Sequence, residues 1–156
     1  MLSIDTNLLV YAQNAGCDEH RRARAFLSAC RERDVVICEL VLVELYLVLR
    51  SAAIVSRPLV AEDAVEVCSA YRNNPRWRLV EHAPVMAEVW ERAKATDFAR
   101  RRIVDARLAL TLRHHGVTEL ATANVRDFHG FGFVRVWNPI KDAETQSLTT
   151  AGETDA

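Results

Sequence analysis

The sequence predicts a single α/β domain in which helices cover both faces of a parallel sheet. Three observations lead to this fold class. Short apolar runs alternate with longer segments of helical periodicity, as in strand–helix–strand units. The run 35–38 is hydrophobic at every position, which is typical of a strand buried on both faces. The chain has 156 residues, 50% hydrophobic and 26% charged, a size and balance that suit one domain with one core.

The first half of the chain contains two predicted strands and three predicted helices. A strand at 1–4 stops abruptly at the Asp, Thr and Asn residues of positions 5–7, which are helix-capping types, so a helix should begin there. Apolar residues recur at helical spacing over 18–33, with Asp18 as the expected cap. The strand 35–38 follows. The leucine-rich segment 39–50 has no break for a turn and therefore predicts a helix rather than a strand.

The second half continues the alternation. Helices are expected at 62–71, 84–94 and 103–115, and strands at 77–80, 119–122 and 133–136. Pro75 ends the first of these helices, Pro84 suits the first turn of the second, and Asp97 or a neighbour opens the third. Gly116 stands where a left-handed cap would close that third helix. Residues 1–139 should form the domain, and the polar segment 140–156 predicts a disordered tail.

Composition and charge exclude several classes of protein. The longest apolar stretch, 40–49, is interrupted by Glu44 and falls short of the roughly 20 residues that cross a membrane. Asp5 comes too early for a secretory signal, so we expect a cytoplasmic protein. The four cysteines show no close spacing and are expected as small buried side chains. The net charge of −1 argues against nucleic-acid binding by bulk charge, but not against a local basic strip.

Four acidic residues are predicted at one edge of the sheet. Asp5 ends the first strand, Glu44 lies in the helix after the second, Asp105 begins the helix 103–115, and Asp127 follows the strand 119–122. Each alone has a simpler explanation: a helix cap, a buried arginine partner for Glu44 such as Arg50 or Arg107, or a loop position. Together they would repel one another unless a divalent cation neutralised them. Oxygen ligands without a set of His or Cys favour Mg²⁺ or Mn²⁺.

Other catalytic motifs are missing from the sequence. It contains no GxSxG nucleophile turn and neither of the phosphate-binding patterns GxGxxG and GxxxxGK[ST]. An aspartyl phosphatase of the haloacid-dehalogenase type would also begin with an acid after the first strand. That class needs DxDxT, whereas Asn7 occupies the position of the second acid.

Four stretches of the chain carry a family resemblance: IDTNLLVYA, LVLVELYLVLR, IVDARLALTLRHHG, and ELATANVRDF followed by FVRVWNP. In order and spacing, over residues 1 to 139, they resemble the PIN-domain ribonucleases and, within them, the VapC toxins of bacterial toxin–antitoxin pairs. The resemblance implies a three-layer α/β/α sandwich with a mostly parallel five-stranded sheet. It also implies a metal-dependent endoribonuclease that uses Mg²⁺ or Mn²⁺. A non-catalytic PIN-like module that binds RNA or protein is the alternative.

Residue roles follow from the same resemblance. The catalytic acids match Asp5, Glu44, Asp105 and Asp127, with Asp5 and Asp105 as the primary metal ligands. The positions that line or orient the site match Thr6, Asn7, Thr122 and Asn124. Family members often carry an aspartate where this chain has Asn124, and Asp127 is the other candidate for the fourth acid.

Partners are also implied by the resemblance. A VapB-type antitoxin would cover the site and carry the operator-DNA contacts, so this chain alone should not bind DNA; a homodimer is expected. For the RNA substrate, Arg101, Arg102 and Arg126 are candidate phosphate-binding groups, with a solvated charged face as the alternative for each. The three tryptophans are expected in the core rather than as base-stacking groups.

Overall fold

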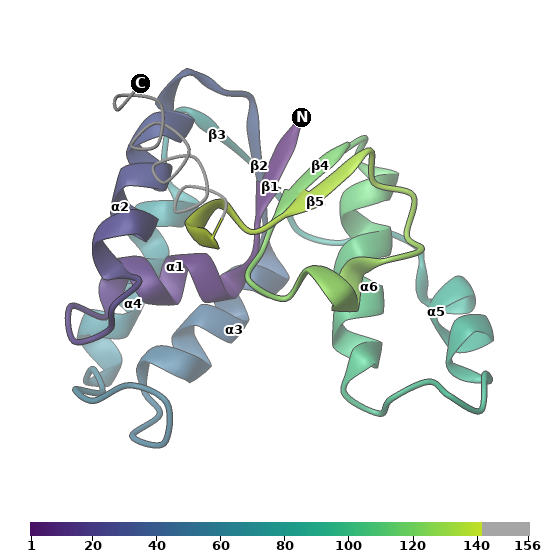
Figure 1. Cartoon of the computed structure of the whole chain (residues 1–156), viewed down its shortest axis with the longest axis horizontal. Coiled ribbons are helices and arrows are strands. Elements are labelled where there is room, and N and C mark those ends of the chain that lie inside the picture. Colours follow the sequence, from purple (N-terminus) through teal and green to yellow (C-terminus); the bar gives the residue numbers. More distant parts are fainter. Residues whose placement is uncertain (142–156) are drawn as a thin grey trace, which may run out of the picture.

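Five parallel strands form one sheet in the computed structural model, which describes residues 1–141 (Figure 1). The strand order is β3-β2-β1-β4-β5, and every neighbouring pair is parallel. The bounds are β1 Leu2–Ile4, β2 Val35–Cys38, β3 Trp77–Val80, β4 Glu119–Ala121 and β5 Arg135–Trp137. The predicted tail lies outside the described residues except for its first two positions, and Ile140 is buried against the core.

The helices form two layers, one on each side of the sheet. Helices α1 to α4 lie to the left of the sheet in Figure 1, and α5 and α6 lie to the right. Their bounds are α1 Thr6–Gln13, α2 His20–Ala29, α3 Glu39–Leu49, α4 Ala61–Arg72, α5 Met86–Ala93 and α6 Arg102–His114, with short 3-10 turns η1 at Cys30–Glu32 and η2 at Val125–Phe128. The predicted α/β/α sandwich is therefore confirmed. Within residues 1–141, none of these helices is long and apolar enough to cross a membrane.

Three elements have a boundary that differs from the prediction by two residues or more. Helix α2 starts at His20 and Asp18 does not cap it; its C-terminal end tightens into η1. Helix α5 starts at Met86 rather than at Pro84, because the Val85 N–H first bonds the Ala83 carbonyl in a tight turn. The last strand starts two residues late.

The late start of β5 has a local cause. Gly130 and Gly132 both adopt positive φ values, 81° and 78°, which lengthen the turn before the strand. The N–H groups of Val134 and Arg135 then both bond the Thr118 carbonyl, at 2.8 and 3.3 Å, as the chain enters the sheet.

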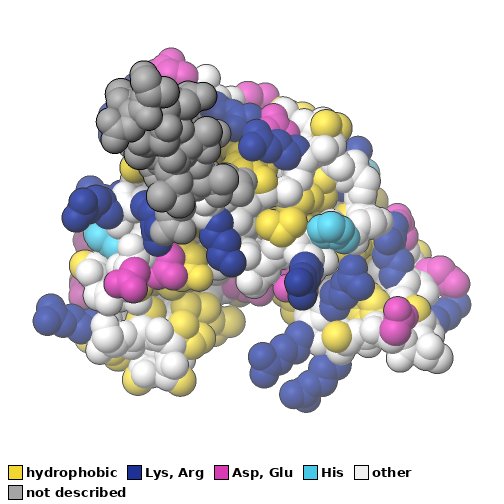
Figure 2. Space-filling view, viewed as in Figure 1, with side chains coloured by type: hydrophobic (Ala, Val, Ile, Leu, Met, Phe, Trp, Pro, Cys, Tyr) yellow, Lys and Arg dark blue, Asp and Glu magenta, His cyan; other side chains and the backbone are white. Residues whose placement is uncertain are grey.

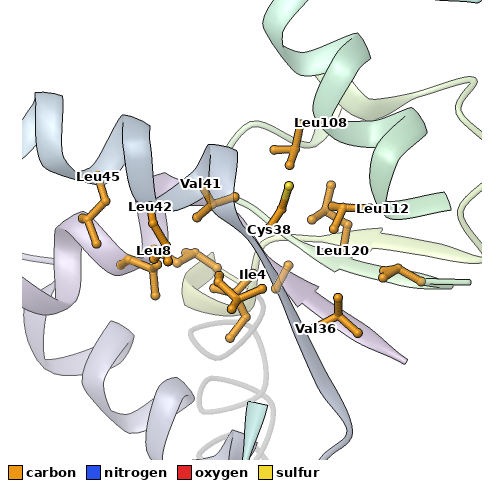
Figure 3. Packing of buried hydrophobic residues seen from close by; sticks show 14 of the residues in the cluster. Ile4, Leu8, Val36, Cys38, Val41, Leu42, Leu45, Leu108, Leu112 and Leu120 are labelled. Atoms are coloured by element: carbon orange, nitrogen blue, oxygen red, sulfur yellow. The ribbon is translucent and has the colours of Figure 1, made fainter. Parts of the chain in front are cut away.

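The core is built around β1 and β2, the two strands with helices packed on both faces. Every residue of both strands is buried, which explains why β2 is apolar at every position and why β1 interrupts its apolar residues only with the small side chain of Ser3. Leucines and valines of α1 and α3 pack beside the sheet, and Leu108 and Leu112 of α6 pack on the α6 side (Figure 3). Trp77 and Trp137 pack partly buried against this core. The core prediction was wrong for Trp90, which is 57% exposed.

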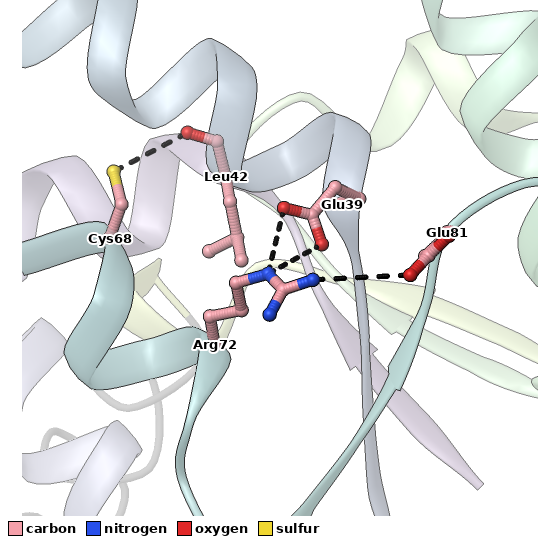
Figure 4. Close-up of polar contacts among 5 residues, drawn as sticks. All are labelled: Glu39, Leu42, Cys68, Arg72 and Glu81. Atoms are coloured by element: carbon pink, nitrogen blue, oxygen red, sulfur yellow. Dashed lines mark hydrogen bonds and ion pairs between the residues drawn. The ribbon is translucent and has the colours of Figure 1, made fainter. Parts of the chain in front are cut away.

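A polar contact between α3 and α4 fixes the start of α3. Arg72 donates from Nε to both carboxylate oxygens of Glu39 at 3.1 Å, and one of its terminal nitrogens lies 3.9 Å from Glu81 (Figure 4). The Cys68 thiol bonds the Leu42 carbonyl one turn further along α3, at 3.5 Å. Glu39 is thus engaged with α4, and α3 is held where it presents Glu44 to the sheet edge.

Candidate active site

Asp5 lies at the carboxyl edge of the sheet, at the end of the central strand β1. It follows β1 directly, is the N-cap of α1, and its backbone N–H bonds the carbonyl of Ala121 at the end of β4. Thr122 continues from β4 beside it. The strand ends and the start of α1 therefore converge at this position, as the sheet topology predicts.

The Asp5 carboxylate is held by three donors. Its Oδ1 accepts the Thr6 N–H at 2.8 Å, and its Oδ2 accepts Asn7 Nδ2 at 2.7 Å and the Thr122 hydroxyl at 2.6 Å. The side chain is buried, and burial raises the pKa of Asp5; the three hydrogen bonds oppose that rise, and the charge of Asp127 adds to it. The orientation of this carboxylate is therefore set by the protein before any ligand binds.

Asn7 and Thr122 join α1 to the loop after β4. Asn7 Oδ1 accepts the Ala123 N–H at 3.0 Å, and its Nδ2 also reaches the Thr122 hydroxyl at 3.2 Å. The same hydroxyl oxygen accepts the Asn124 N–H at 3.0 Å. The residues expected to line or orient the site thus form one connected network around Asp5.

Glu44 reaches the same edge from α3. Its Oε2 accepts the Thr6 hydroxyl at 3.0 Å, which ties it to the first turn of α1. The pKa of Glu44 is raised by burial and by the charge of Asp5, and lowered by the Thr6 hydrogen bond. Neither suggested arginine pairs with it: Arg50 donates instead to the Tyr46 hydroxyl at 2.7 Å, and in the described part of the chain Arg107 forms no ion pair.

Asp105 is the acid on which the negative charges of the other three act. It is half-buried in the first turn of α6, and its pKa is raised to about 6. Burial is the main cause, followed by the negative charges of Asp127, Asp5 and Glu44; Arg102 acts in the opposite direction. Among residues 1–141, no side chain donates a hydrogen bond to its carboxylate. The four acids are therefore close enough to repel one another, and Asp105 bears most of that repulsion.

A cleft of about 420 Å³ opens onto these acids. Asp5, Glu44, Asp105 and Asn124 line it, whereas Asp127 does not. Asn124 thus occupies the position at the cleft, and Asp127, on the exposed turn η2, acts on Asp105 through its charge. The other wall of the cleft is formed by side chains that the sequence did not predict there: Val10, Tyr11, Leu47, Val48 and Ile54. The first four lie one helical turn after Asn7 and Glu44, so helical periodicity contained the signal.

The predicted RNA-binding arginines lie on elements beside Asp105. Arg102 donates to the His129 carbonyl at 3.2 Å and lies over the Phe131 ring, yet its charge still acts on Asp105. Arg101, at the start of α6, and Arg126, on η2, are exposed. Figure 2 shows the molecule hollowed between the two helical layers, with basic side chains gathered on the α5–α6 side of the hollow.

The acids suit a hard divalent cation that keeps part of its water shell. Among residues 1–141, no three His, Cys, Asp or Glu side chains come together as a complete set of metal ligands. Mg²⁺ is typically held by one or two carboxylates, with waters and substrate phosphates completing its octahedron. Asp5, held by three donors, and Asp105, which accepts no hydrogen bond from a side chain of residues 1–141, match that requirement, because added positive charge would relieve the repulsion on Asp105.

Comparison with known proteins assigns a family to this arrangement. The PIN domain family matches residues 2–133. The chain is 60% identical over 141 residues to Ribonuclease VapC24 of Mycobacterium tuberculosis, in strain CDC 1551 / Oshkosh and equally in strain H37Rv; the match covers 90% of this chain and 97% of the relative.

Solved structures share the fold at lower sequence identity. Mycobacterium tuberculosis VapC20, described as a toxin that cleaves the sarcin–ricin loop, superposes with a TM-score of 0.65 at 23% identity over 86% of this chain and 97% of that one. FitAcB from Neisseria gonorrhoeae gives 0.61 at 20% identity over 89% and 98%. VapBC2 from Rickettsia felis, bound to a DNA fragment of its promoter, gives 0.56 at 16% identity over 88% and 98%.

Proposed function

The chain belongs to the PIN-domain family and, within it, to the VapC ribonucleases, and from this premise we propose that it is a toxin endoribonuclease that hydrolyses RNA phosphodiester bonds with Mg²⁺ or Mn²⁺. The observation that carries the proposal is an open cleft of about 420 Å³ lined by Asp5, Glu44 and Asp105, where burial and the neighbouring negative charges raise the pKa of Asp105. Concentrated negative charge at a site for a polyanion needs a cation between the two.

Asp5 and Asp105 are the residues that would hold the cation. An ion bound there supplies positive charge that lowers the pKa of a water molecule and neutralises charge on the phosphate. Asp5 contributes a carboxylate whose direction is fixed by Thr6, Asn7 and Thr122. Asp105 accepts no hydrogen bond from a side chain that the structure describes, so its lone pairs are available to the cation.

Glu44 and the arginines have separate roles in this proposal. Glu44 is aligned by Thr6, and its raised pKa favours acceptance of a proton from the attacking water. Asp127 adds negative charge beside Asp105 and strengthens attraction of the cation. Arg101, Arg102 and Arg126 hold flanking RNA phosphates on the α6 side of the cleft.

The test is incubation of the purified chain, free of antitoxin, with total cellular RNA in Mg²⁺ or Mn²⁺. Parallel reactions contain EDTA or the Asp105→Asn variant, and the cut ends are mapped. We expect discrete cuts that leave 5′-phosphate and 3′-hydroxyl ends and that disappear in both controls. Ends carrying a 2′,3′-cyclic phosphate would refute the metal-hydroxide mechanism. Intact RNA from a folded protein that binds Mg²⁺ would favour the non-catalytic module instead.

We further propose that a VapB-type antitoxin inhibits the chain by covering the carboxylate cleft. Support comes from the likeness to FitAcB and to VapBC2, the latter solved on its promoter DNA. Co-expression with a VapB-type antitoxin should yield a complex whose RNA cleavage is suppressed, and promoter DNA should bind the complex but not this chain alone.

We also propose that the chain forms a homodimer. Val43 and Leu47 of α3 and Val65 of α4 are 51%, 62% and 52% exposed, and they border an apolar hollow of about 290 Å³. Exposed aliphatic groups on two adjacent helices suit an interface between copies of the chain. Light scattering should give twice the monomer mass of 17.6 kDa, and Val43→Glu should return the monomer.

A further inference from the structure

A second pocket lies away from the carboxylate cleft, on the side of the sheet covered by α1 to α4. It has a volume of about 440 Å³ and is bounded by the C-terminal end of α1, by α2 with η1, and by the segment from α4 to β3. The guanidinium groups of Arg24, Arg31 and Arg76 line it. We call it the arginine pocket. None of its lining residues in the described chain is acidic.

The three arginines are not neutralised by the described part of the protein. Elsewhere in the fold arginines pair with acids: Arg33 with Glu119 at 2.8 Å and Arg92 with Glu88 at 2.9 Å. Within residues 1–141, Arg24, Arg31 and Arg76 are exposed and form no ion pair. The pocket therefore concentrates positive charge in a chain whose net charge is −1, which is the condition for binding an anion.

Two stacked aromatic rings line the arginine pocket. The rings of Tyr71 and Trp77 lie 5.6 Å apart and nearly parallel, at 11°. The Tyr71 hydroxyl accepts a hydrogen bond from Gln13 Nε2 at 2.9 Å, which fixes the ring. Proteins bind single-stranded nucleic acids with an aromatic surface beside guanidinium groups, because bases stack on the rings while phosphates bond the arginines.

We propose that the arginine pocket binds single-stranded RNA as a second contact for the RNA cut at the carboxylate cleft. Phosphates would lie against Arg24, Arg31 and Arg76, and a base against the Tyr71–Trp77 pair. The proposal extends the proposed function to a longer substrate. Helix α1 connects the two sites: Asp5 caps its first turn and Gln13 ends it, a length of about 12 Å for eight residues.

An RNA ligand fits the lining better than a peptide does. A docked peptide normally anchors apolar side chains, but among the described lining residues of the arginine pocket only Ala12 and Leu27 supply aliphatic surface. The remaining lining consists of charged, amide, hydroxyl and aromatic groups. The pocket thus offers positive charge and ring surface, the two features that RNA recognition uses most.

The decisive measurement is RNA binding in EDTA, which requires no cleavage. Fluorescence anisotropy of a labelled RNA of about 16 nucleotides is recorded across a range of salt concentrations. The test variant is Arg24→Ala/Arg31→Ala. The matched control is Arg21→Ala/Arg57→Ala, which removes two other exposed arginines that lie outside the pocket. Equal thermal melts of the two variants establish that both are folded.

We expect the test variant to bind about tenfold more weakly than the control, with a salt slope smaller by about 1.4, or 0.7 for each lost phosphate contact. In Mg²⁺, its KM for the long RNA should rise with kcat unchanged, while a substrate of about 4 nucleotides should be cut equally by both. If no RNA is cut but the slope difference persists, the proposed function fails and the arginine pocket stands.

Two results would overturn the inference. One is an identical salt slope and affinity for the two variants. The other is RNA binding that is unchanged while the test variant alone no longer copurifies with the antitoxin, which would make the arginine pocket a protein-docking surface.

Discussion

Replacing Asp105 with asparagine should abolish RNA cleavage and stabilise the fold at neutral pH. The pKa of this carboxyl is raised from 3.8 to about 6, which corresponds to about 3 kcal/mol at full burial. Because Asp105 is only half-buried, solvent screening reduces that figure to about 1 to 2 kcal/mol. No described donor bonds its carboxylate, so asparagine loses no hydrogen bond. The melting temperature should rise by about 2 to 8 °C for a chain of this length.

The sign of the pH dependence follows from the raised pKa. Between pH 4 and pH 6 the folded state binds more protons at Asp105 than the unfolded state does, so this group makes stability fall as pH rises. The wild-type chain and Asp105→Asn should therefore melt together near pH 4, separate as the pH rises to about 6, and keep a constant difference above it. Calorimetric melts in EDTA at both pH values measure this. A variant that is less stable at pH 7, or a difference that is the same at both pH values, would refute the electrostatic argument.

Three further predictions concern the same site. Glu44→Gln should abolish cleavage and keep the wild-type melt, because the glutamine carbonyl still accepts the Thr6 hydroxyl; wild-type cleavage would exclude Glu44 as the proton acceptor. Thr122→Val removes one donor to Asp5 and should lower Mg²⁺ affinity about 10- to 100-fold in titration calorimetry, whereas an unchanged affinity would mean that the other two donors suffice. Mg²⁺ affinity should also fall about tenfold per pH unit below pH 6, as protons compete for Asp105; a pH-independent affinity would place the ion elsewhere.

The fold was largely predictable because its signals are local. The strand Val35–Cys38 is apolar at every position, and the structure buries all four residues between helices. The predicted boundaries were wrong where a backbone hydrogen bond sets the start of an element. The turn at Val85 delays the start of α5, and the hydrogen bonds from the Val134 and Arg135 N–H groups to the Thr118 carbonyl delay the start of β5. Trp90 was misplaced because an aromatic residue in a helix does not reveal on which side its neighbours lie.

The site was predictable only in part. Parallel topology brings strand ends together, so the convergence of Asp5 and Thr122 follows from sequence order. Sequence order does not predict which of the acids experiences the strongest electrostatic repulsion. That Asp105 bears the repulsion depends on distances among four separate elements, and that Asn124 rather than Asp127 lines the cleft depends on the path of one turn.

The acids of the cleft differ in how many protein hydrogen-bond donors hold them, and this difference indicates different roles. Three donors hold Asp5, one holds Glu44, and none of those described holds Asp105. A buried carboxylate with donors is already partly compensated, whereas one without donors must be compensated from outside the chain or by a proton. The protein therefore orients Asp5 in advance and leaves Asp105 dependent on a ligand. By this argument the free chain should be less stable than Asp105→Asn, and the proposed cation would relieve the repulsion and complete the site.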